Sequence, residues 1–158
     1  MTGTPRPYVA VTFSPQPSVA YFLRGVLDSA GFEVARASFS PEDLETAIHR
    51  ARPDVIVYDV SSPCRENWRQ CRRLLDRAAA YDIPVVITTS EKRELKEAVG
   101  VSAAVELFRS ADDVSRLRRA VRRAVQATDP GRGDENPAGL ATSGYDPGSA
   151  RPRSSRSV

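Results

Sequence analysis

The chain has 158 residues, of which 41% are hydrophobic and 27% are charged. This length suits one domain with an apolar core and argues against a two-domain enzyme. The formal net charge is +3, and the four arginines beyond Thr128 are balanced by four acidic residues there. The remaining excess is far from the concentrated basic stripe that nucleic-acid binding requires, so we expect no direct nucleic-acid partner.

The N-terminal residues and the two cysteines indicate a cytoplasmic protein. Residues 1–10 contain no charged region followed by a long apolar one, and no apolar stretch approaches the roughly 18 residues of a membrane span. Cys64 and Cys71 share one face of a predicted helix, without CxxC spacing or partner histidines. We therefore expect reduced structural thiols and no membrane partner.

The first part of the chain alternates apolar runs with stretches of helical period. The predicted elements are a strand at 8–13, a helix at 14–31, a strand at 32–38, a helix at 40–52 and a strand at 54–60. Gly31 is expected to end the first helix. Ser40 as N-cap, Pro41 as first helical residue and Asp43 three residues after Ser40 predict a capped start for the second.

The second part continues the same alternation. A helix after the third strand is followed by a strand at 83–89, a short helix from Ser90, a strand at 103–108 and a last helix capped by Ser110 and Asp113. The last helix carries its apolar residues on one face, as do the others. Its expected buried residues are Val114, Leu117, Val121, Ala124 and Val125.

Five apolar strands that alternate with amphipathic helices need cover on both faces, which predicts an α/β fold with a doubly wound parallel sheet. The compact five-stranded order is 2-1-3-4-5, and its switch point lies between the carboxyl ends of strands one and three. Asp59 ends strand three and should point into that crevice. The side chains expected beside it are Thr12, Phe13, Ser14, Thr88 and Thr89.

The sequence lacks the motifs that bind several classes of ligand. The segment after strand one, residues 12–18, contains no glycine, which excludes a GxGxxG dinucleotide site and a glycine-containing flavin phosphate loop. A P-loop is also missing. The sole histidine, His49, lies in mid-helix without further ligands at metal-binding spacing, so we expect no metal site there.

The chain divides into three regions by composition. Residues 1–6 form an N-terminal extension, and residues 7–127 form the domain. Residues 128–158 are rich in Pro, Gly and Ser, without apolar periodicity, and predict a disordered tail.

The order of elements, "PDVIVYDVSSP" at strand three, "IPVVITTS" at strand four and "AAVELFRSADDVSRL" at strand five together resemble a response-regulator receiver domain, which has a CheY-like, flavodoxin-like fold. The resemblance implies that Asp59 accepts a phosphoryl group from a sensor kinase. It also implies that Thr89 hydrogen-bonds the phosphoryl oxygens and that Pro63 is the loop proline.

Five other positions depart from the pattern of that family. The acidic pair that helps to hold a divalent cation aligns with Thr12 and Phe13, and neither is a carboxylate. The lysine after strand five becomes Arg109, and Ser110 replaces the proline that follows it. The switch aromatic aligns with Glu106. We therefore expect an atypical site without a bound metal or other cofactor, with Mg²⁺ relevant only if Asp59 is a working phosphoacceptor.

Two further expectations concern charge. Arg109 should form an ion pair with Asp59, which would hold the pKa of Asp59 at or below the ordinary aspartate value. The last helix should present a basic outward face, which in this family belongs to the usual dimer or partner surface. The arginines of that face are Arg116, Arg118, Arg119, Arg122 and Arg123. Such a face would suit an acidic protein partner.

The combined hypothesis is a stand-alone, atypical receiver domain that is not an enzyme and acts as a protein-interaction module in two-component signalling. Its partner would be a sensor kinase or another signalling protein, and a homodimer is compatible with the pattern. The first alternative is a functional phosphoacceptor that is phosphorylated on Asp59. The second is an enzyme of another class on the same fold, which is disfavoured because no nucleophile with a base partner lies near the crevice.

Overall fold

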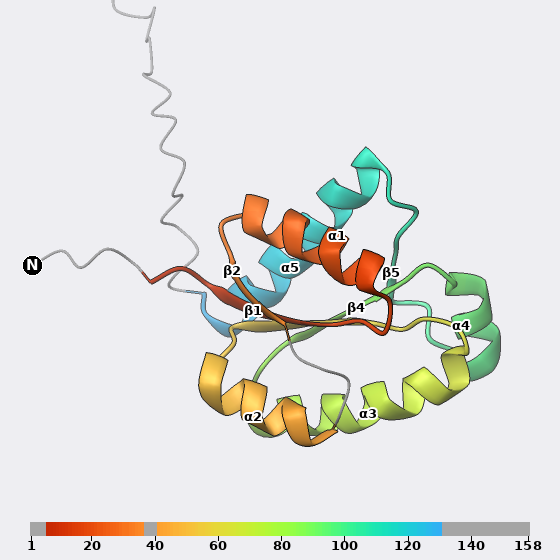
Figure 1. Cartoon of the computed structure of the whole chain (residues 1–158), viewed down its shortest axis with the longest axis horizontal. Helices are drawn as coiled ribbons and strands as arrows, with labels where there is room; N and C mark the ends of the chain where they lie inside the picture. The colour runs from red at the N-terminus through yellow and green to blue at the C-terminus, as the bar shows by residue number, and fades with distance from the viewer. Residues whose placement is uncertain (1–5, 37–40, 131–158) are drawn as a thin grey trace, which may run out of the picture.

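Five parallel strands form one sheet in the order β2-β1-β3-β4-β5, as predicted (Figure 1). The computed structural model describes residues 6–36 and 41–130. The elements are β1 (Val9–Phe13), α1 (Pro17–Ser29), β2 (Glu33–Arg36), α2 (Pro41–Ala51), β3 (Val55–Asp59), α3 (Cys64–Ala80), β4 (Val85–Thr89), α4 (Lys92–Val99), β5 (Val105–Glu106) and α5 (Ala111–Thr128).

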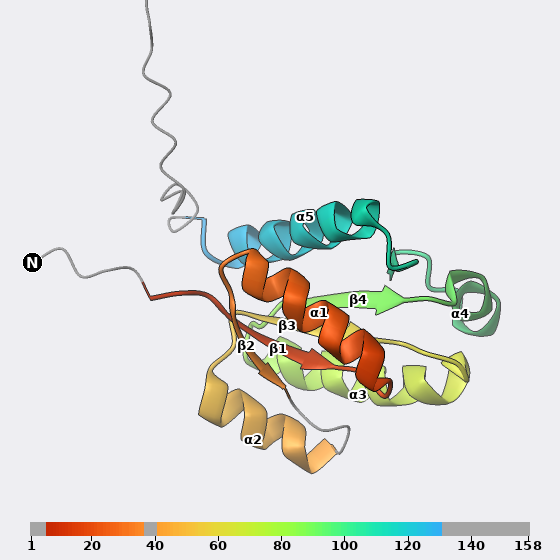
Figure 2. The same ribbon diagram turned by 45° about the horizontal axis from the view of Figure 1, so that its top comes forward.

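Helices cover both faces of the sheet (Figure 2). Helices α1 and α5 pack on one face, and α2, α3 and α4 contribute to the core on the other. The central strand β3 serves both layers, because successive side chains of a strand point to opposite faces. Val55 and Val57 join the layer of α1 and α5, whereas Ile56 and Tyr58 join the layer of α2 and α3.

The helix boundaries predicted at Gly31 and Ser110 are confirmed, whereas α4 begins at Lys92 rather than at Ser90. Gly31 follows α1 with φ +87°, and Gly100 ends α4 with φ +75°, a region that glycine adopts without a steric penalty. At the start of α5, the Asp113 carboxylate accepts a 3.0 Å hydrogen bond from the Ser110 backbone N–H. Strand β5 is shorter than predicted and contains Val105 and Glu106 alone.

Some expectations lie outside the described residues. These are the capping role of Ser40, most of the N-terminal extension and nearly all of the predicted C-terminal tail. Both cysteines are buried free thiols, as expected. Burial raises the pKa of Cys64 to about 11 and that of Cys71 to about 12, so neither thiol is activated as a nucleophile.

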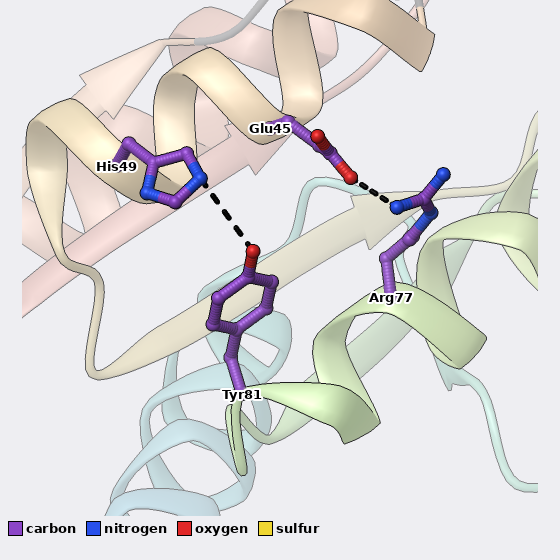
Figure 3. Close-up of polar contacts among 4 residues, drawn as sticks. All are labelled: Glu45, His49, Arg77 and Tyr81. Atoms are coloured by element: carbon purple, nitrogen blue, oxygen red, sulfur yellow. Dashed lines mark hydrogen bonds and ion pairs between the residues drawn. The ribbon is translucent and has the colours of Figure 1, made fainter.

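Helix α2 meets α3 through two exposed polar contacts in addition to its apolar residues (Figure 3). The Arg77 guanidinium of α3 forms an ion pair with Glu45 of α2. One turn further along, the ring of Tyr81 lies edge-on to His49, with 5.8 Å between ring centroids and 3.5 Å from the hydroxyl to Nε2. These contacts tie the two helices on the side of the sheet opposite α5.

Candidate functional site around Asp59

Asp59 is a buried carboxylate at the carboxyl end of β3, with 1% of its surface exposed. Three hydroxyl groups donate hydrogen bonds to it. Ser61 donates to Oδ2 at 2.7 Å and Thr88 to Oδ1 at 3.0 Å. Ser14 donates to Oδ2 at 3.3 Å. We call this group the hydroxyl cage, because it satisfies both carboxylate oxygens from three different parts of the chain: the β1–α1 loop, the β3–α3 loop and β4.

The environment of Asp59 raises the pKa of its carboxyl above the ordinary value. Burial is the largest cause, because removal from water disfavours the charged form. The hydrogen bonds from Ser61, Thr88 and Ser14 oppose this effect, and the charge of Arg109 opposes it least. The expectation of a normal or lowered pKa is therefore wrong, because it considered a cation and neglected the burial of the carboxylate.

Arg109 does not form the expected ion pair with Asp59. Its side chain is exposed, and Nη2 donates a 3.0 Å hydrogen bond to the hydroxyl of Ser18, in the first turn of α1. Within residues 6–36 and 41–130, none of the ion pairs involves Asp59. Arg109 lies in the loop between β5 and α5 with a positive φ of 58°, and its guanidinium is hydrogen-bonded to α1.

The two threonines that end β4 have different partners. Thr88 lies directly opposite Asp59 in the β3–β4 register, on the same face of the sheet. Thr89 faces the other way, and its hydroxyl donates a 2.7 Å hydrogen bond to the Val60 carbonyl. The sequence interpretation favoured Thr89 as the site residue and treated Thr88 as ordinary strand composition. Strand alternation could have separated the two threonines, but only the register pairs Thr88 with Asp59.

Thr12 and Phe13 end β1 beside β3, as predicted, and both are buried. The Phe13 ring stacks on Tyr58, with 5.9 Å between centroids, and belongs to the core between the sheet and helices α2, α3 and α4. This end of β1 therefore contributes an aromatic ring and one hydroxyl, but no carboxylate. Glu106 pairs with Thr89 on the neighbouring strand and is half-buried.

The β3–α3 loop is held in place by side-chain hydrogen bonds. Asn67 Nδ2 donates a 2.7 Å bond to the Ser61 carbonyl. Glu94 of α4 accepts bonds from the Ser62 hydroxyl at 3.1 Å and from the Cys64 backbone N–H at 3.0 Å. These bonds lower the pKa of Glu94 and cap the N-terminus of α3, which begins after Pro63.

The donor set around Asp59 does not fit Mg²⁺. This cation requires near-octahedral oxygen ligands, usually one or two carboxylates together with waters or phosphate. Here the one carboxylate accepts hydrogen bonds from three hydroxyl groups, and the nearby Ser61 carbonyl accepts one from Asn67. Among the described residues, no group of three or more His, Cys, Asp or Glu side chains could hold a metal ion.

Comparisons with known proteins agree with this fold. No protein-family model matches the chain. The protein PilH of Pseudomonas aeruginosa is 27% identical over 84 residues, which cover 53% of this chain and 69% of PilH. A putative response regulator from Chloroflexus aurantiacus is 25% identical, with a TM-score of 0.56, and the match covers 76% of this chain and 98% of that structure. By fold and by sequence, this chain is similar to response-regulator receiver domains.

The chemotaxis protein CheY4 of Vibrio cholerae has the same fold as this chain at 22% identity. Its TM-score is 0.52, and the match covers 73% of this chain and 99% of CheY4. The sheet order 2-1-3-4-5 places Asp59 at the carboxyl edge of the sheet, where such folds bind their ligands. None of the helices within residues 6–36 and 41–130 has both the length and the apolar composition of a membrane span.

Four of the five arginines predicted for the outward face of α5 are exposed. They are Arg116, Arg119, Arg122 and Arg123. Arg118 differs, because its guanidinium is half-buried against α1 and donates a hydrogen bond to the hydroxyl of Ser29. Its Nε is buried without a partner. Arg118 therefore belongs to the contact between α1 and α5. The basic face of α5 consists of the other four arginines, and we call it the α5 basic face.

Proposed function

We propose that this receiver domain acts in two-component signalling as a protein-interaction module whose output does not depend on Mg²⁺-assisted phosphorylation of Asp59. The hydroxyl cage is the observation that carries the proposal. Phosphorylation of a carboxylate brings two anions together and needs positive charge in place beforehand. At this site hydroxyl groups occupy both carboxylate oxygens, and Arg109 is bound to Ser18.

The α5 basic face is the proposed contact surface. It carries four exposed guanidinium groups, and its apolar side is already used, because Leu117, Val121 and Val125 are buried against the sheet. Exposed charges of one sign attract a surface of the opposite sign and increase the rate of association. We therefore propose an acidic protein partner, either a sensor kinase or another signalling protein, with homodimer formation as a further outcome to be measured.

A functional phosphoacceptor is the second candidate. Its support is the position of Asp59 at the carboxyl end of β3, together with the proximity of Arg109, whose charge lowers the pKa of Asp59. Incubation with acetyl phosphate and Mg²⁺, followed by intact-mass measurement, separates the two candidates. We expect no phosphoryl adduct. An adduct that is lost in Asp59→Asn would establish the phosphoacceptor and contradict our proposal.

A pull-down from cell extract tests the surface. The charge-reversed variant Arg119→Glu/Arg122→Glu/Arg123→Glu should lose the partner while circular dichroism shows an unchanged fold. Asp59→Asn should retain the partner, because a phosphoryl group is not the proposed trigger. Arg118 is left unchanged, because it packs against α1. Loss of the partner in Asp59→Asn and its retention in the charge-reversed variant would contradict the proposal.

A further inference from the structure

Helix α3 carries a second set of arginines on the side of the sheet opposite α5 (Figure 2). Arg65, Arg69, Arg72 and Arg73 are all exposed, and we call them the α3 arginine stripe. Their spacing places them along one face of the helix over about 12 Å, at 1.5 Å per residue. The opposite face of α3 is the buried one and holds Cys71, Leu74 and Ala78.

Three other helix arginines of the described ranges form ion pairs. Arg77 forms an ion pair with Glu45 across α2 and α3 (Figure 3). Arg93 lies 3.0 Å from Glu97 within α4, and Arg24 lies 3.6 Å from Asp28 within α1. None of the ion pairs between described residues includes a member of the α3 arginine stripe.

The arginines of the stripe repel one another along α3, and none of the ion pairs between described residues joins them to Glu66 or Asp76. Like charges three or four residues apart repel, and Arg69 has Arg65, Arg72 and Arg73 at these spacings. Arg65 also lies in the first turn of α3, where a positive charge opposes the helix dipole. An anion bound along the stripe would relieve both effects.

We propose that the α3 arginine stripe binds an acidic helix of a partner protein. Two turns of such a helix present carboxylates at the spacing of the guanidinium groups, which bind carboxylates with two parallel hydrogen bonds. The stripe is a contact separate from the α5 basic face, because the sheet lies between the two helices. The inference therefore does not rest on the function proposed for α5.

The charges at the two ends of the stripe favour a short acidic helix over nucleic acid. Glu66 follows Arg65 in the first turn, and Asp76 lies one turn beyond Arg72 and Arg73; both are exposed. A continuous polyanion that extends past the stripe would meet these carboxylates and be repelled. A helix with two turns of acidic residues fits between them.

The test uses the full chain with Arg119→Gln, Arg122→Gln and Arg123→Gln, so that the α5 basic face cannot contribute. The probe is a synthetic fluorescent helical peptide with glutamates at positions i, i+4, i+7 and i+8, and the same peptide with glutamines is its control. Fluorescence anisotropy at about 50 mM salt, where screening is modest, should show saturable binding of the glutamate peptide alone.

Adding Arg65→Gln, Arg69→Gln and Arg72→Gln should weaken this binding by about tenfold or more. The matched control adds Arg24→Gln and Arg93→Gln, which removes paired arginines and should change the affinity by less than about twofold. Circular dichroism verifies the fold of each variant. Equal losses in the two variants, the absence of saturable binding, or equally tight binding of a random DNA duplex would overturn the proposal.

Discussion

The hydroxyl of Thr88 donates a 3.0 Å hydrogen bond to Oδ1 of Asp59 from the position directly opposite it in the β3–β4 register. Both side chains are buried, so neither group can exchange this partner for water. The bond therefore links the Asp59 carboxylate of β3 to β4. Its loss should be measurable as a decrease in the free energy of unfolding.

Thr88→Val, a change of nearly constant shape, should lower the free energy of unfolding at neutral pH by about 1.5–3 kcal/mol, the usual range for a hydrogen bond to a charged group. Urea denaturation measures the change. In the Asp59→Asn background the same substitution should cost less, because the acceptor is no longer charged. Equal losses in both backgrounds would mean that Thr88 stabilises the sheet independently of Asp59.

The raised pKa of Asp59 predicts a specific pH dependence. A carboxyl whose pKa is higher in the folded state binds its proton more tightly when folded, so its contribution favours folding at low pH and is lost as pH rises through the folded pKa. Asp59→Asn should therefore be more stable than the wild type at pH 7, with a difference that shrinks as pH falls toward 3.8. Denaturation curves across pH measure this difference. A stability advantage of the wild type at pH 7 would contradict the desolvation argument.

The pKa of Asp113 is shifted in the opposite direction to that of Asp59. Burial would raise its pKa, but backbone hydrogen bonds from Ser110 and Phe108 outweigh this effect and lower it. Its contribution is present above the unfolded pKa and is lost as pH falls through the folded pKa. Asp113→Ala should cost about 0.5–2 kcal/mol of stability at pH 7, the range for a helix cap. The neighbouring Asp112→Ala is the control, because Asp112 is exposed and should have a smaller effect.

Arg118 and Arg119 are neighbours in sequence with different environments. Arg118→Ala should lower the free energy of unfolding by about 0.5–1.5 kcal/mol, because it removes the hydrogen bond to Ser29 on α1. Arg119→Ala should change it by less than about 0.5 kcal/mol, because the side chain is exposed. Thermal unfolding of the two variants provides the comparison. Equal effects would show that Arg118 does not support the packing of α1 on α5.

The sequence alone determined the order of the helices and strands along the chain and predicted the order of the strands in the sheet. The alternation of apolar strands with amphipathic helices predicts both covered faces, and Gly31 and Asp113 mark real helix boundaries. The position of Asp59 at the end of β3 followed from the same pattern. These features are local, because hydrophobic period and capping chemistry depend on residues within a few positions of one another.

The partners of the site residues were decided by tertiary structure. Asp59 is bound by Thr88 rather than by Arg109, because the register of β4 on β3 places one threonine opposite it and turns the next one away. Arg109 reaches Ser18, and Arg118 leaves the predicted basic face because α1 packs beside it. Such contacts join residues far apart in the chain, and a local pattern does not specify which side chain meets which across a packed interface, nor how much water remains around a carboxylate.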